Sequence, residues 1–105
     1  MPQFAVHLNT NPATRTRIPY LLDIQSDLIA ELGTRVVVPL YSADVMKGKV
    51  LKTLMPVFEV EGNAVVMVTP EMAGAPRRIL GQQVADLADA RHEVIAALDL
   101  LITGI

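Results

Sequence analysis

The spacing of apolar residues changes once along the chain, after Gly81. Beyond this point they recur at the i, i+3, i+4, i+7 spacing of an amphipathic helix. We therefore predict a helix over residues 84–102, with Asp86 and Asp89 in its first turns, where acidic groups favour the helix dipole. Gly104 is placed to end it. The apolar face comprises Val84, Leu87, Ala88, Val94, Ile95, Leu98, Leu101 and Ile102, with Arg91 as its one charged member.

Before Gly81 the chain is a series of short strand-like segments. The clearest signal is the pair 56–61 and 64–69 around Gly62-Asn63, which predicts a hairpin. Residues 35–41 contain a Val36-Val37-Val38 run typical of a buried strand, and Pro39 within it indicates a sheet edge or a bulge. Further strands are predicted over 4–8, 18–24 and 77–80, loops over 9–17 and 70–76, and a short helical turn over 26–32, while 42–54 is either a turn or a short helix.

Strands followed by one helix, without strand–helix alternation, indicate an antiparallel sheet or small barrel with a helix on one side. We therefore expect a mainly β fold with one C-terminal helix. A chain of 105 residues, 51% of them hydrophobic, is expected to form a single domain over 1–105.

Composition excludes several classes of protein. There is no cysteine, which excludes a disulfide, a thiolate nucleophile and a cysteine-ligated metal. The net charge of −2 argues against a protein that binds nucleic acid unaided. The N-terminal residues do not have the pattern of a signal peptide, and no apolar run reaches the length of a membrane span. We expect a cytoplasmic protein with no membrane association.

Side chains that could support catalysis are few. The two serines, Ser26 and Ser42, are not in a nucleophile elbow, and Ser26 is placed to cap a short helical turn. His7 is expected on a strand and His92 on the polar side of the helix, so structural or solvated roles are favoured over a metal site. No cofactor or metal is expected.

Charged side chains give two further candidates. Asp23 and Asp27 form a carboxylate pair only if the chain turns between them, and we favour a turn acid and a capping acid. The adjacent pair Arg77-Arg78 could form a basic patch with Arg15, Arg17 and Arg35, although ordinary surface charge is the favoured interpretation. A chain with this residue chemistry is expected to act by binding.

The C-terminal segment 100–105 (LLITGI) gives the helix an apolar end. Leu101 and Ile102 could pack back on the core. Alternatively, Ile102 and Ile105 could form an exposed apolar patch for a partner. The sequence pattern does not decide between these two interpretations.

Several segments, taken in order and spacing, resemble the CcdB family of plasmid-maintenance toxins. They are Gln3-Phe4, residues 22–29 (LDIQSDLI), 35–40 (RVVVPL), 67–76 (MVTPEMAGAP), 81–87 (GQQVADL) and the terminal Gly104-Ile105. The resemblance covers almost the whole chain. It implies a homodimeric SH3-like barrel, extended by a small antiparallel sheet and closed by the C-terminal helix.

The resemblance also implies a function. Such toxins are not enzymes: they bind the A subunit of DNA gyrase and trap the gyrase–DNA cleavage complex. A cognate antitoxin neutralises the toxin, and the two together repress their operon, so operator DNA is met only through the antitoxin. By position, the gyrase-binding residues implied here are Leu28, Ile29, Asp99, Ile102, Thr103, Gly104 and Ile105.

This chain departs from the family pattern at Thr103, where the best-known pattern has tryptophan, a common binding hot spot. Asp99 also places a charge where the pattern can have a neutral amide. Two alternatives therefore stay open. One is a MazF-like endoribonuclease toxin using Arg15, Arg17 and Thr14, and the other is a homologue that binds antitoxin but no longer poisons gyrase.

Overall fold

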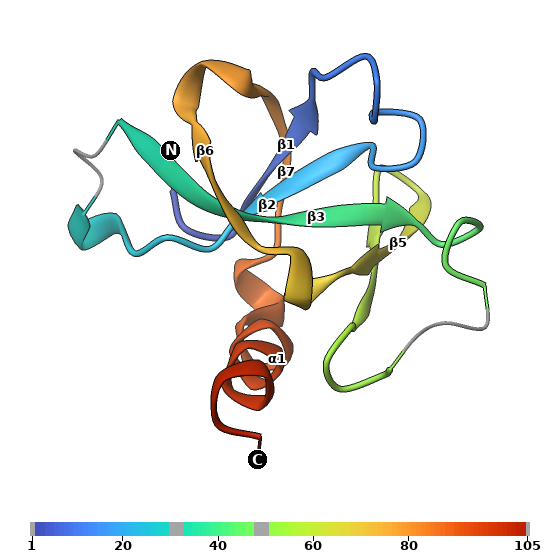
Figure 1. Ribbon diagram of the computed structural model, residues 1–105, viewed down its shortest axis with the longest axis vertical. Coiled ribbons are helices and arrows are strands. Elements are labelled where there is room, and N and C mark those ends of the chain that lie inside the picture. Colours follow the sequence, from blue (N-terminus) through green and yellow to red (C-terminus); the bar gives the residue numbers. More distant parts are fainter. Residues whose placement is uncertain (1, 30–32, 48–50, 105) are drawn as a thin grey trace.

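The computed structural model describes residues 2–29, 33–47 and 51–104. Antiparallel strands form one curled sheet, and a helix lies beneath it with its C-terminal end pointing away (Figure 1). The sheet order is β4-β5-β3-β2-β1-β7, and β6 pairs with β3. This confirms the mainly β fold with a C-terminal helix. The strands are β1 (Ala5–Asn9), β2 (Tyr20–Asp23), β3 (Thr34–Ser42), β4 (Val57–Val60), β5 (Asn63–Met67), β6 (Ala73–Pro76) and β7 (Leu80–Asp86).

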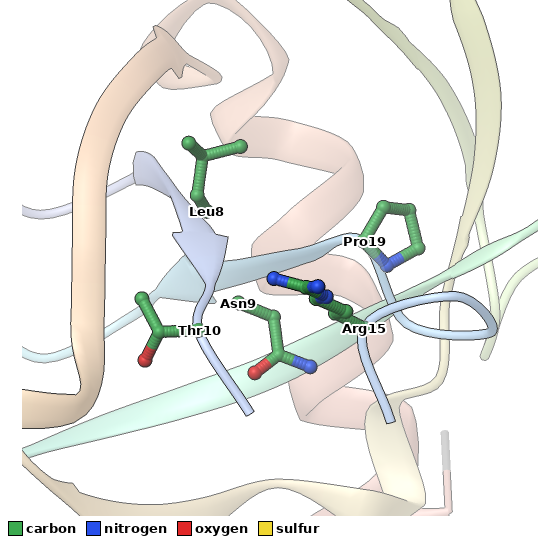
Figure 2. Close-up of a pocket in the computed structure, with 5 residues that line it drawn as sticks. All are labelled: Leu8, Asn9, Thr10, Arg15 and Pro19. Carbon is green, nitrogen blue, oxygen red and sulfur yellow. The ribbon is translucent and has the colours of Figure 1, made fainter. Parts of the chain in front are cut away.

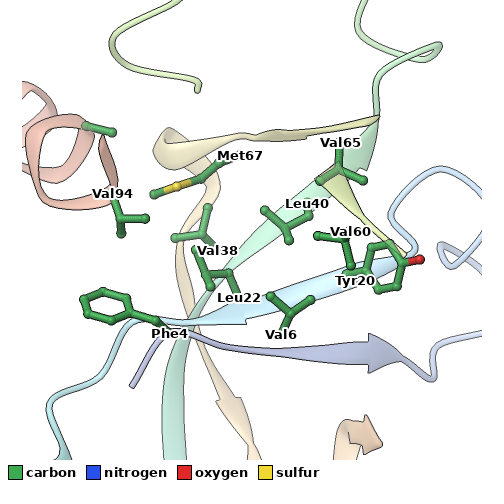
Figure 3. Close-up of a cluster of buried hydrophobic side chains, with 11 residues drawn as sticks. Phe4, Val6, Tyr20, Leu22, Val38, Leu40, Val60, Val65, Met67 and Val94 are labelled. Atoms are coloured by element: carbon green, nitrogen blue, oxygen red, sulfur yellow. The ribbon is translucent and has the colours of Figure 1, made fainter. Parts of the chain in front are cut away.

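The core lies between the inner face of the curled sheet and the helix α1 (Arg91–Thr103) (Figure 3). Alternate residues of the strands point to this face, because successive side chains of a strand point to opposite sides. From the helix, Val94 and Ala97 are completely buried. The fully buried members of this cluster are Phe4, Val6, Tyr20, Leu22, Val38, Leu40, Val60, Val65, Met67, Val94 and Ala97.

Strand β3 lies inside the sheet, so the prediction that Pro39 marks an edge or bulge was wrong. The Pro39 carbonyl accepts a hydrogen bond from Val68 N at 3.1 Å. The proline nitrogen faces the same side, where β3 changes partner from β5 to β6. At this point neither β5 nor β6 needs an N–H from β3, so proline, which lacks one, is tolerated.

The helix begins at Arg91, later than predicted, and has 13 residues. Residues up to Asp86 instead continue β7, and the 3-10 helix η4 (Ala88–Ala90) leads into α1. Pairing of β1 with β7 skips Val84, since Val6 is opposite Ala85 and His7 is opposite Gln83. Such a bulge breaks the alternation of a strand, which is why the apolar residues here have a helix-like spacing. Asp86 and Asp89 therefore precede the helix.

The predicted end of α1 is confirmed. Gly104 ends the helix with a φ of 74°, and its N–H donates to Leu100 O at 2.9 Å. This left-handed conformation is the one that glycine adopts without strain. The charge of Arg91 on the apolar face is accommodated by Phe4, because the guanidinium carbon lies 5.7 Å from the ring centroid.

The hairpin between β4 and β5 is confirmed, with its turn one residue earlier than predicted. Val60 pairs with Asn63, so Glu61 and Gly62 form the two-residue turn. Both have positive φ, 53° and 80°, which is the conformation of a type I′ turn. Tyr20 Oη supports the turn by donating to Glu61 Oε1 at 2.9 Å.

Two other predictions were wrong. The predicted loop 70–76 contains the 3-10 helix η2 (Thr69–Glu71) and strand β6, and the predicted strand 77–80 begins with the 3-10 helix η3 (Arg77–Ile79). Proline and glycine made β6 read as a loop, but it pairs on only one side, with β3, where proline is tolerated. Within 42–54, the described residues 43–47 and 52–54 form turns, and 48–50 lie outside the described residues.

Gly81 on β7 leaves no room for a side chain, because Leu8 and Thr10 lie against it. A Cβ at this position would be 2.8 Å from Leu8 O and 3.0 Å from Thr10 Cγ2. We expect Gly81→Ala to lower the free energy of unfolding by about 1–3 kcal/mol. The matched control is Gly74→Ala, since nothing lies within 4 Å of a Cβ there. Urea denaturation of both variants checks this, and equal stabilities would contradict the predicted clash.

Candidate functional site

The C-terminal end of α1 leaves the core. Val94 and Ala97 are buried, and Leu101 is only half-buried, whereas Ile102 is 72% exposed. Asp99, Thr103 and Gly104 are also exposed, and Ile105 lies outside the described residues. In a single chain, Ile102 therefore does not pack back on the core. We refer to residues 102–105 as the C-terminal tip; Figure 1 shows the end of α1 projecting away from the sheet.

The polar groups of this end are used within the helix. Thr103 Oγ1 donates to Asp99 O at 2.6 Å. The glycine cap described above takes up Leu100 O. Of the described residues at this end of the helix, Ile102 is the apolar side chain that is most exposed.

The second predicted site segment is the 3-10 helix η1 (Asp27–Ile29). Leu28 is 95% exposed and Ile29 is 51% exposed. Ser26 caps this turn as predicted, because Leu28 N donates to its Oγ at 3.1 Å. The remainder of the predicted helical segment, residues 30–32, lies outside the described residues. Two adjacent aliphatic side chains are thus presented to solvent on a short, capped turn.

Behind this turn lies a buried ion pair. Arg35 Nε donates to Asp23 Oδ2 at 2.7 Å and Arg35 Nη2 to Asp23 Oδ1 at 3.0 Å, and both side chains are fully buried. Asp27 Oδ1 lies 3.9 Å from Arg35 Nη2. The expectation that Arg35 belongs to ordinary surface charge was therefore wrong. The chain does turn between Asp23 and Asp27, and the two carboxylates meet at this arginine rather than pairing with each other.

The structure does not bring the two predicted segments together within one chain. In Figure 1, the turn that carries η1 lies at one side of the sheet, while the tip lies at the far end of α1. The described members of the predicted gyrase-binding set are thus exposed at two separate places, Leu28 and Ile29 on η1 and the others at the end of α1. Two copies of the chain are required if they are to form one surface, as the two-fold symmetry of most oligomers allows.

The residues named for the ribonuclease alternative line a different part of the molecule. Figure 2 shows Arg15 pointing into a shallow pocket beside Asn9 and Pro19, with Leu8 and Thr10 completing its wall. The Thr14 hydroxyl accepts a hydrogen bond from Asn9 Nδ2 at 3.0 Å. The guanidinium of Arg17 lies 6.0 Å from the Tyr41 ring centroid. Thr14 and Arg17 thus have structural partners, and Arg15 lines the pocket.

The titratable side chains His7, His92 and Tyr41 lie outside the two predicted site segments. His7 is buried on β1, with Nδ1 3.0 Å from Gly81 O, and His92 is exposed on α1. Burial, and then the hydrogen bond to Glu71, raise the pKa of the Tyr41 hydroxyl above its usual 10.0, so that it donates at neutral pH.

Within residues 2–29, 33–47 and 51–104, no group of three His, Cys, Asp or Glu side chains is arranged to hold a metal. No helix in the described part of the chain has the length and apolar character to cross a membrane.

Comparison with known protein families identifies the chain. Residues 3–104 match the family model described as CcdB protein, which leaves only three residues unmatched. The chain belongs to the CcdB family. This confirms the resemblance found in the sequence and agrees with the curled sheet and C-terminal helix. The CcdB family is one of toxin–antitoxin gyrase poisons, and its known partners are gyrase and an antitoxin.

Proposed function

We propose that this CcdB-family chain is the toxin of a type II toxin–antitoxin module that binds the gyrase A subunit and traps the gyrase–DNA cleavage complex. The observation that carries the proposal is the family match over residues 3–104, because it includes the C-terminal helix and its Gly104 cap. The exposed Ile102 at the end of that helix supports the assignment of the tip as the gyrase contact.

The proposed contact is apolar and is made twice. In a homodimer, two copies of the tip enter a groove between two gyrase subunits with matching symmetry. Thr103 replaces the aromatic residue of the family pattern, and its hydroxyl is bonded within the helix. Ile102 is therefore the main apolar group that the described part of the tip offers. Leu28 and Ile29 supply the remainder of the proposed contact.

We also propose that the toxin acts by binding and without catalysis or a cofactor. A cognate CcdA-like antitoxin neutralises it, and operator DNA is bound only through that antitoxin. The proposed site of action is the cytoplasm, where gyrase acts on DNA.

A DNA-cleavage assay tests the proposal. The folded chain is incubated with gyrase from its own host, ATP and supercoiled plasmid, followed by detergent and protease. We expect a linear product, because a poison that traps the cleaved state leaves a double-strand break once the protein is removed. No linear product, from a preparation shown to be folded and dimeric, would contradict gyrase poisoning. Cleavage of bare RNA by the chain, abolished by Arg17→Ala, would support the ribonuclease alternative instead.

A further inference from the structure

The buried amide side chain of Gln25 ties the main chain at Ile29 to the sheet. Its Nε2 donates to Ile29 O at 2.9 Å, and its Oε1 accepts from Val36 N at 3.0 Å. The residue is 5% exposed. A single side chain thus connects the exposed turn η1 to the central strand β3. Both ends of the buried amide therefore bond main chain, which uses its donor and its acceptor.

The backbone of Gln25 is fixed as well. Its N–H donates to Asp23 Oδ1 at 3.0 Å, and its carbonyl accepts from Arg35 Nη2 at 3.2 Å. These are the two members of the buried ion pair, so the main chain of Gln25 is bonded to fully buried side chains. A rotation of the Gln25 side chain away from the turn would break its bond to Ile29 O and leave Val36 N unpaired, which is costly in a buried site.

Other contacts hold the turn at its exposed side. Gln3 N donates to Asp27 Oδ1 at 2.9 Å, and Ile29 N donates to Ser26 O at 3.2 Å. Most of the Leu28 side chain touches nothing in the chain, so its position depends on the backbone alone. Holding such an apolar side chain in place before binding lowers the entropy lost on association.

We propose that Gln25 is a positioning residue, which holds Leu28 and Ile29 in the conformation that binds the gyrase A subunit. The inference rests on the proposed function. Gln25 acts through the turn and does not itself contact the partner. Without it, the turn samples other conformations, and the apparent affinity falls in proportion to the fraction of chains that remain competent.

Gln25→Glu is the sharpest test. The carboxylate keeps the acceptor for Val36 N, but it replaces the amide donor with an acceptor facing Ile29 O. We expect gyrase affinity to fall about tenfold, the change that corresponds to one lost hydrogen bond of ordinary strength. Gln82→Glu is the matched control, because it adds the same charge at an exposed position of β7. Gln25→Asn, which is too short to reach both partners, is the second variant and avoids the added charge.

A double-variant cycle separates positioning from general destabilisation. In a Leu28→Ala, Ile29→Ala background, Gln25→Glu is expected to change gyrase affinity by less than about twofold, because the groups it positions are gone. A tenfold loss that persists in this background overturns the inference. Affinity is measured by surface plasmon resonance with immobilised gyrase A subunit.

Backbone ¹⁵N relaxation of the free protein gives a readout independent of gyrase. We expect the order parameters of residues 27–29 to fall in Gln25→Glu and Gln25→Asn, while those of β3 stay unchanged. Unchanged order parameters in both variants would overturn the role of Gln25. A wild-type chain that fails to bind gyrase would overturn the proposed function and the gyrase-specific part of this inference, whereas the relaxation data alone decide whether Gln25 fixes the turn.

Discussion

Deletion of residues 103–105 is expected to abolish gyrase poisoning while leaving the fold intact. The deleted residues Thr103 and Gly104 are exposed, and their hydrogen bonds are made only to the last turn of α1. The core residues of the helix, Val94 and Ala97, lie well before the deletion. The expected cost in stability is therefore at most about 1 kcal/mol, because the end of a helix normally frays. Binding should fall by roughly a hundredfold, as for loss of a central interface residue.

The measurement combines the cleavage assay with circular dichroism and sedimentation. Val57→Ala is a matched control, because Val57 is also an exposed aliphatic residue, 55% exposed, on the edge strand β4. It should poison like the wild-type chain. A deleted protein that is unfolded would show that the tip belongs to the core. A folded deletion that still traps cleaved DNA would exclude residues 103–105 as a required part of the gyrase contact.

The order of elements was predictable from sequence because local patterns decide it. Gly62 indicated the hairpin and Gly104 indicated the end of the helix. Both have a positive φ, which glycine adopts without the strain that other residues have. The start of the helix was not predictable. The bulge at Val84 is specified by pairing with β1, which is distant in sequence, and local apolar spacing does not reveal it.

In the candidate site too, some features were predictable from the sequence and others required the structure. Leu28 and Ile29 came from the family resemblance and the apolar end of the helix from the sequence pattern, while the exposure of Leu28, Ile29 and Ile102 required the structure. The residues that support them were missed, because a buried role for Arg35 depends on Asp23 lying on the neighbouring strand. One signal was present in the sequence. Arg35 precedes an apolar run and is the charged residue of a predicted buried strand, a position where an arginine needs a carboxylate partner.

The η1 turn and the C-terminal tip are held in place by different contacts. The turn is held by buried polar groups, so its shape depends on the ion pair and on Gln25. The tip depends only on the continuity of α1 and its glycine cap. A variant can therefore damage one feature and leave the other, so the two proposed contributions to gyrase binding are separable by mutation.

Asp23→Asn is expected to have the largest effect on stability. It removes the buried partner of Arg35 and leaves only the exposed carboxylate of Asp27, 3.9 Å away, as counter-charge; removing one member of a buried pair costs about 3–5 kcal/mol. This is a large part of the 5–15 kcal/mol typical of a folded domain. Asp27→Asn is the matched control. Its carboxylate is 61% exposed and 3.9 Å from Arg35, so the expected loss is below about 1 kcal/mol.

Urea denaturation at a fixed protein concentration measures these differences. The double variant Asp23→Asn, Arg35→Met should recover most of the stability, because it removes the unpaired charge and keeps an apolar stem of similar length. If Asp23→Asn and Asp27→Asn were equally stable, the buried pair would not be a main support of the sheet. The double variant also tests the connection to the turn, because it removes the Arg35 donor to Gln25 O. With stability restored, a remaining loss of gyrase affinity would come from that missing hydrogen bond.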